Sequence, residues 1–114
     1  MFAYHTLTTT GAPALVQPKP NQNCDFLGCA CTNNETSTTI YLKIWWQGNS
    51  NAAPVIGTTA PNLTIAIPAA GTYFVHPVAL IMPGLMFFAV TKLQADTDAT
   101  ALSTGGEAIT LFLE

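Results

Sequence analysis

The most regular pattern in the chain is an alternation of side chains between residues 38 and 47. A period of two is typical of a β-strand whose two faces meet different surroundings. The second face holds Lys43 between Tyr41 and Trp45, so we expect the lysine to reach water and a loop or another subunit to cover part of this face. The first face, which we expect to lie in the core, consists of Ile40, Leu42, Ile44 and Trp46.

Several shorter segments also have the composition of strands. In residues 62–67, large apolar side chains alternate with smaller or polar ones, and Pro61 and Pro68 bound the segment. Residues 2–9 are β-prone and predict either a first strand or an arm on a neighbouring subunit. No window keeps a helical period, and the prolines exclude a long helix. Other extended segments are expected at residues 72–75, 79–82, 85–93 and 107–113.

Turn-forming residues separate these segments. Residues 11–34 collect Pro, Gly and Asn and predict a long loop, and residues 48–51 predict a turn. We therefore predict an all-β chain, a single antiparallel β-sandwich or jelly-roll-like domain over residues 1–114. Residues 1–37 would supply an N-terminal strand or arm and the Cys/Pro/Asn-rich loop, and residues 38–114 the sandwich core. The expected core residues are Ile40, Leu42, Ile44, Trp46, Leu63, Ile65, Ile67, Leu85, Phe87, Ile109, Leu111 and Leu113.

Charged side chains are scarce for a chain of this length. They make up 8% of the 114 residues, with three Lys, no Arg and six Asp or Glu, against about 25% in an average soluble domain. A neutral exterior rich in Thr suits a protein that packs against neighbours. The chain cannot neutralise a row of phosphates, so we expect no nucleic-acid partner.

Neither a membrane span nor a secretion signal is expected. The longest apolar stretch, residues 74–90, is interrupted by His76, Pro77, Pro83 and Gly84. The N-terminus lacks a basic region followed by a continuous apolar one.

The titratable side chains are scattered, which predicts a chain that is not an enzyme, with no catalytic residue and no cofactor. Asp96 and Asp98 are the closest carboxylates, and we expect them in a solvated turn rather than in a calcium loop. His76 precedes a proline and is expected to be structural.

The three cysteines, Cys24, Cys29 and Cys31, lie in one short stretch. They could form one local disulfide with a leftover thiol, remain reduced as buried or loop thiols, or serve as weak metal candidates together with His5 or His76. A spacing of one residue between Cys29 and Cys31 is unlike a zinc knuckle, so no metal site is predicted.

Trp45 and Trp46 are adjacent and must point to opposite faces of a strand. One is expected in the core, and the other is either an interface anchor or an aromatic platform for a sugar. Asn34 and Asn62 match the glycosylation pattern, but without a signal peptide we expect neither to be modified.

Four features between Tyr41 and Glu114 occur together: a Tyr-x-Lys strand, the segment Gly-Thr-Thr-Ala-Pro at 57–61, the strand end Ile-Pro-Ala at 67–69, and the acidic loop 95–101 before a last strand. In these features the chain resembles small structural proteins of tailed bacteriophages. The N-terminal third departs from their pattern.

This resemblance implies a virion component, a capsid decoration or cement protein that bridges major capsid subunits, often as a trimer. Its partners would be the major capsid protein or other virion proteins, without nucleic acid or membrane, and its place would be the capsid surface after assembly in the host cytoplasm. A tail, baseplate or head-fibre component is the alternative among structural proteins, and a carbohydrate-binding or adhesion module is the alternative of another class. Possible interface residues are Phe2, Tyr4, Tyr41, Trp45, Phe74, Met86, Phe88 and Phe112.

Overall fold

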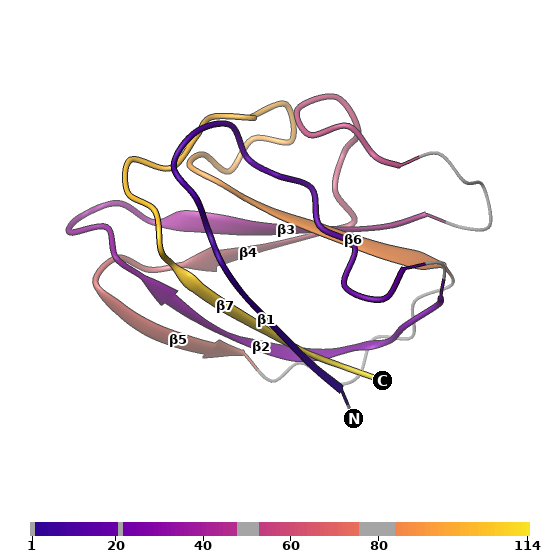
Figure 1. Cartoon of the computed structure of the whole chain (residues 1–114). Helices are drawn as coiled ribbons and strands as arrows, with labels where there is room; N and C mark the ends of the chain where they lie inside the picture. The colour runs from indigo at the N-terminus through magenta and orange to yellow at the C-terminus, as the bar shows by residue number, and fades with distance from the viewer. Residues whose placement is uncertain (1, 21, 48–52, 76–83) are drawn as a thin grey trace.

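Two antiparallel β-sheets lie face to face in the computed structural model, which describes residues 2–20, 22–47, 53–75 and 84–114 (Figure 1). One sheet has four strands in the order β1-β7-β2-β5, and the other has three in the order β4-β3-β6. The prediction of an all-β sandwich is confirmed. The strands are β1 (Phe2–Leu7), β2 (Phe26–Asn33), β3 (Ile40–Gln47), β4 (Leu63–Ile67), β5 (Gly71–Val75), β6 (Leu85–Thr91) and β7 (Ala108–Leu113).

The main core fills the space between the sheets. Strand β7 shows the reason: its buried residues alternate with half-buried ones, so that Ile109, Leu111 and Leu113 all face inward. Trp46 is half-buried and packs against this core. The buried members of the core are Cys24, Phe26, Cys29, Cys31, Ile40, Leu42, Ile44, Ile67, Met86, Phe88, Val90, Leu102, Ile109, Leu111 and Leu113.

The chain crosses repeatedly from one sheet to the other. After β1 it passes to the edge of β6, where Val16 forms an isolated bridge with Phe88, and it then returns to the first sheet as β2. From β2 onward every connection crosses except that between β3 and β4, which are neighbours in one sheet. Strands that are distant in sequence, such as β1 and β7, are therefore paired.

Strand β2 lies within the predicted loop 11–34, and that part of the prediction is wrong. It is an inner strand, between β7 and β5. A β-bulge shifts the register between Phe26 and Gly28, where Gly28 has φ of 152°. The extra residue reverses the alternation, so that Phe26 before it and Cys29 after it both enter the core. Because of this reversal, residues 26–33 do not show the continuous period of two by which a strand is predicted.

Strand β6 faces the core with the opposite set of side chains from the one predicted. Met86, Phe88 and Val90 belong to the main core, whereas Leu85 and Phe87 pack on the outer side with Trp45. Leu15 and Ile56, from two loops, cover that outer side. A strand buried on both faces reads as a continuous apolar run, which does not indicate which set points inward. The predicted segments 48–51 and 79–82 and His76 lie outside the described residues.

Candidate assembly surface

The outer face of the four-stranded sheet is the most distinctive surface of the described chain. Residues directly opposite each other on paired strands share one face of a sheet, and the register therefore defines this surface. None of its members is Lys, Arg, Asp or Glu. We call it the outer face, and it consists of Ala3, His5 and Leu7 of β1, Ala108, Thr110 and Phe112 of β7, Ala30 and Thr32 of β2, and Thr72 and Phe74 of β5.

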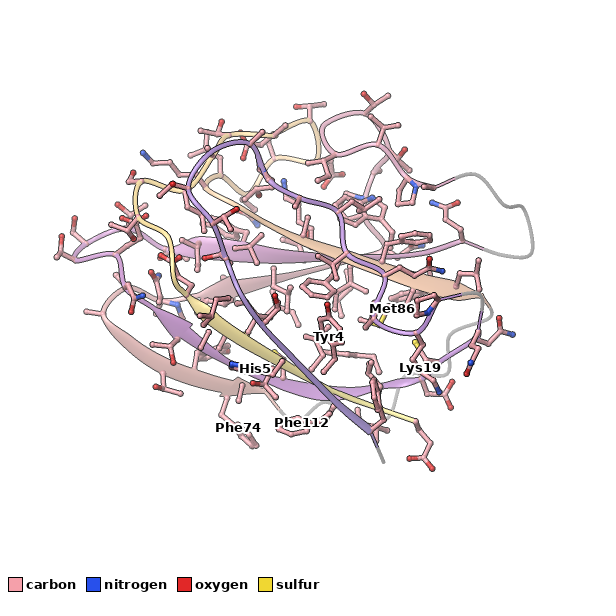
Figure 2. All side chains as sticks on the ribbon, in the orientation of Figure 1. Tyr4, His5, Lys19, Phe74, Met86 and Phe112 are labelled. Atoms are coloured by element: carbon pink, nitrogen blue, oxygen red, sulfur yellow. The ribbon has the colours of Figure 1, made fainter. Side chains whose placement is uncertain are left out.

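Side-chain contacts connect neighbouring strands across the outer face. His5 Nδ1 lies 2.9 Å from Thr110 Oγ1, and the hydroxyls of Thr32 and Thr72 are 3.3 Å apart. The rings of Phe74 and Phe112 meet edge to face, with centroids 6.1 Å apart. Figure 2 shows these two rings projecting together from the outer side of the sheet. The polar groups of the face thus partly satisfy one another.

Large apolar side chains remain open to solvent on this sheet. Leu7 is 58% exposed and Phe74 is 52% exposed. A solvated face of an antiparallel sheet normally alternates polar residues outward, whereas here Ala, Leu and Phe share the face with Thr. A sheet face without Lys, Arg, Asp or Glu that exposes large apolar side chains among Thr residues is typical of a surface that packs against another molecule.

The predicted interface residues separate into three groups. Phe2, Phe74 and Phe112 lie at the surface, fully or partly exposed. Tyr4 and Tyr41 are half-buried, and Tyr4 packs edge-on against Phe88 with ring centroids 5.9 Å apart. The third group corrects the sequence prediction, because its residues are buried inside the domain: β6 is covered on both faces, and loops cover the outer side of β3. These residues are Trp45, Met86 and Phe88.

Lys43 was predicted to reach water and is instead fully buried. Its Nζ donates to the backbone carbonyl of Ala95 at 2.6 Å and to that of Asp98 at 3.3 Å. Burial lowers the pKa of Lys43, while the nearby carboxylates of Asp98 and Asp96 act in the opposite direction. By these two hydrogen bonds Lys43 connects β3 to the loop after β6. No local pattern in the sequence indicates this role.

The Asp96–Asp98 pair does not form a solvated turn as a whole. Asp96 is exposed, but Asp98 is buried and organises the loop. Asp98 Oδ2 accepts from the Leu93 N–H at 2.9 Å, and Oδ1 accepts from the N–H of Thr100 at 3.1 Å and from its hydroxyl. Burial alone would raise the pKa of Asp98, but these hydrogen bonds and Lys43 outweigh it and lower the pKa.

Two further carboxylates, Glu35 and Glu107, are buried where the ends of several strands meet. Glu35 Oε1 accepts from the N–H groups of Ser103 and Thr104 at 3.0 and 3.1 Å. Glu107 accepts from the hydroxyls of Thr104, at 2.8 Å, and Thr8. These bonds are to backbone N–H and hydroxyl groups, so both carboxylates serve to hold the loop that precedes β7.

All three cysteines are buried free thiols, which answers the question of a disulfide. Cys24 Sγ donates to Met86 Sδ at 3.7 Å. Burial raises the pKa of Cys24, and a hydrogen bond with Cys29 is the main cause that raises the pKa of Cys31. Among the described residues no three His, Cys, Asp or Glu side chains gather as a metal site. His76, named with the cysteines as a weak candidate, lies outside these residues.

Neither tryptophan forms an open platform. Trp45 is buried and its Nε1 donates to the carbonyl of Thr59 at 2.9 Å, while Trp46 is half-buried against the main core. The two asparagines of the glycosylation pattern are exposed but used structurally. Asn34 Nδ2 donates to the Gly106 carbonyl, and Asn62 Oδ1 accepts from the Trp46 N–H.

Comparisons with protein-family models, with curated proteins and with solved structures found no match to this chain. In the part of the chain that the structure describes, no helix has the length and apolar character needed to cross a membrane.

Proposed function

We propose that the chain is a non-enzymatic structural protein of a virion, a capsid decoration or cement protein that stabilises a phage head by bridging major capsid subunits. The outer face of the four-stranded sheet carries this proposal. It offers ten residues of four strands without a formal charge, together with the ring pair of Phe74, which is exposed, and Phe112, which is half-buried.

The chemistry of the outer face suits burial in a permanent contact. Burying an unpaired charge is costly, and this face has no Lys, Arg, Asp or Glu to bury. Two of its hydroxyls, those of Thr32 and Thr72, lie within hydrogen-bonding distance of each other. Phe74 and Phe112 provide aromatic area of the kind that dominates the energy of protein interfaces. A protein of this type works by burying area at a joint, without catalysis.

The order of the strands in the two sheets supports the same class of protein. With the Val16 bridge counted as a reduced strand, the sheets have the orders β1-β7-β2-β5 and Val16-β6-β3-β4. This is the order of a jelly roll, an architecture found in viral capsid domains and also in lectins. The fold alone does not assign a function, so the outer face remains the main argument.

The proposal includes a homo-oligomer, with a trimer as the favoured state, on the capsid surface after assembly in the host cytoplasm. The major capsid protein is the proposed partner, and neither nucleic acid nor membrane takes part. A tail, baseplate or head-fibre component would use the same kind of face. The alternative of a sugar-binding module rested on an exposed tryptophan, whereas Trp45 is buried and Trp46 is half-buried against the main core.

Light scattering together with cosedimentation on phage heads that lack the protein tests this function. We expect a defined oligomer that rebinds the heads. Phe74→Lys should abolish rebinding because it places a charge within the buried contact. The matched control is Val55→Lys, since Val55 is 57% exposed on a loop away from the outer face. A monomer that ignores the heads, or equal rebinding by the two variants, would contradict the proposal.

A further inference from the structure

His5 is the one titratable side chain among the described residues that form the outer face. It projects from β1 beside β7, and its ring is exposed (Figure 2). A proton on His5 would therefore place a positive charge on a face that otherwise has none. The residues around it on this face are Ala3 and Leu7 along β1, Thr110 directly opposite, and Ala108 and Phe112 on either side of Thr110.

The titratable side chains of β1 and of the strands beside it point to the other face of this sheet. Tyr4 of β1 packs against Phe88, and Cys29 and Cys31 of β2 belong to the main core. Glu107, just before β7, is buried and accepts from two threonine hydroxyls. Because the sheet lies between them and the ring, none of these groups can pair with a charge on His5.

Two further carboxylates lie at one end of the sheet, where Asp25 and Glu114 exchange backbone hydrogen bonds. Glu114 lies roughly 13 Å beyond Thr110 along the direction of β7, at about 3.3 Å per residue. That separation exceeds the Debye length of about 8 Å at physiological ionic strength, so dissolved ions screen these charges from His5.

The hydrogen bonding of His5 distinguishes its neutral form from its protonated form. Nδ1 lies 2.9 Å from Thr110 Oγ1, and within the described part of the chain no residue bonds to Nε2. A neutral ring has one donor and one acceptor nitrogen, whereas a protonated ring donates from both. Thr110 can serve Nδ1 in either form. The protonated form leaves an additional N–H and a positive charge that only the surrounding water stabilises.

We propose that His5 makes the contact of the outer face sensitive to acid: the contact forms while the ring is neutral and dissociates when the ring gains a proton. This inference rests on the proposed function, since it concerns the regulation of the same face. Histidine is the side chain whose charge ordinarily changes between pH 5 and 8.

The cause is the loss of water from the outer face on binding. In the free protein, water solvates a charged ring. In the contact that water is displaced, and a charge on His5 would be buried on a face that offers no carboxylate, which is costly. The complex therefore holds fewer protons than the separate molecules, and by linkage its affinity falls as the pH decreases.

Cosedimentation of the full chain with phage heads that lack it, at pH 7.5 and at pH 5.5 in the same salt concentration, tests this inference. We expect binding to be at least about fivefold weaker at pH 5.5 and to recover on return to pH 7.5. Circular dichroism at both pH values checks that the fold itself is unchanged.

Two substitutions at His5 separate its proton from other titrating groups of the complex. His5→Gln keeps an amide that can bond to Thr110 but gains no proton, so its affinity should be the same at both pH values, whatever its level. His5→Lys carries a charge at both pH values and should bind weakly at both. The matched control is His76→Gln, which removes the other histidine of the chain and should keep the pH dependence of the wild type.

The outcomes distinguish this inference from the function on which it rests. A wild-type protein that does not bind the heads at pH 7.5 would overturn both. Three results would overturn only the acid sensitivity assigned to His5: binding that is equal or tighter at pH 5.5, a pH dependence that persists in His5→Gln, or full affinity of His5→Lys.

Discussion

The ammonium group of Lys43 and the carbonyl oxygen of Ala95 lie 2.6 Å apart, although 52 positions separate them in the chain. Lys43 belongs to β3, the middle strand of the three-stranded sheet, and Ala95 to the loop after β6. The contact gives the backbone carbonyls of Ala95 and Asp98 a charged hydrogen-bond donor, where they would otherwise face an apolar sheet. This arrangement makes the loop dependent on one buried side chain.

Replacing that side chain should loosen the loop. We expect Lys43→Met to lower the free energy of unfolding by about 1–3 kcal/mol, because the carbonyls of Ala95 and Asp98 lose their donor. Urea denaturation measures the change. The matched control is Lys92→Met, since the ammonium group of Lys92 donates to the hydroxyl of Ser103 at the surface and the loss of this bond should stay within about 0.5 kcal/mol. Equal effects of the two substitutions would show that Lys43 does not support the loop.

Acid should weaken the protein through Asp98. In the unfolded chain this carboxyl titrates near 3.8, and hydrogen bonds from Thr100 and Leu93 lower its pKa in the fold. Between the two values the unfolded state binds more protons, so stability falls as pH decreases through that window. The urea midpoint of Asp98→Asn should be lower than that of wild type at pH 5, and the gap should narrow at pH 3. Asp96→Asn, at an exposed position, should follow the wild type.

The thiols of Cys24, Cys29 and Cys31 should resist alkylation in the native state. All three are buried and free, and the raised pKa values of Cys24 and Cys31 reduce their thiolate form further. We expect iodoacetamide to label them only after unfolding, as counted by mass spectrometry. Thr72→Cys, on the exposed end of the outer face, should react at once. If two cysteines stayed unlabelled by iodoacetamide after unfolding without reductant, they would form a disulfide, which would contradict the structure.

The bulge in β2 should depend on glycine. Gly28 has φ of 152°, in a region that other residues avoid, so Gly28→Ala should cost about 1–3 kcal/mol of unfolding free energy. Ala30→Gly, two residues further along the same strand, changes only backbone freedom and should cost roughly 1 kcal/mol or less. If Gly28→Ala left the free energy of unfolding unchanged, the bulge could shift along β2, and the register of Cys29 and Cys31 would shift with it.

Local pattern was sufficient for much of the sandwich. The predicted segments for β1, β3, β4, β5, β6 and β7 agree with the structure within two residues. Alternation predicted β3 and β4, the prolines at 61 and 68 bound β4, and the β-prone or extended composition predicted the others. The charge-poor composition indicated a surface suited to packing. Among the suggested interface residues, Phe74 and Phe112 do lie on the uncharged outer face.

Only the tertiary structure decided which side of each strand is covered. Burial depends on what other segments place above a face, and a period of two is the same for either choice. The sequence therefore suggested Met86 and Phe88 as interface residues, although both face the main core. Strand β6, to which they belong, is buried on both faces. Strand β2 was missed because its bulge reverses the alternation in mid-strand.

The outer face, on which the proposed function rests, arises from pairing between distant segments. Local sequence establishes the class of fold and the scarcity of charge, because both follow from residue types and their period. The outer face exists because β1, β7, β2 and β5 are neighbours in one sheet. Such contacts join residues far apart along the chain, and no local period encodes them.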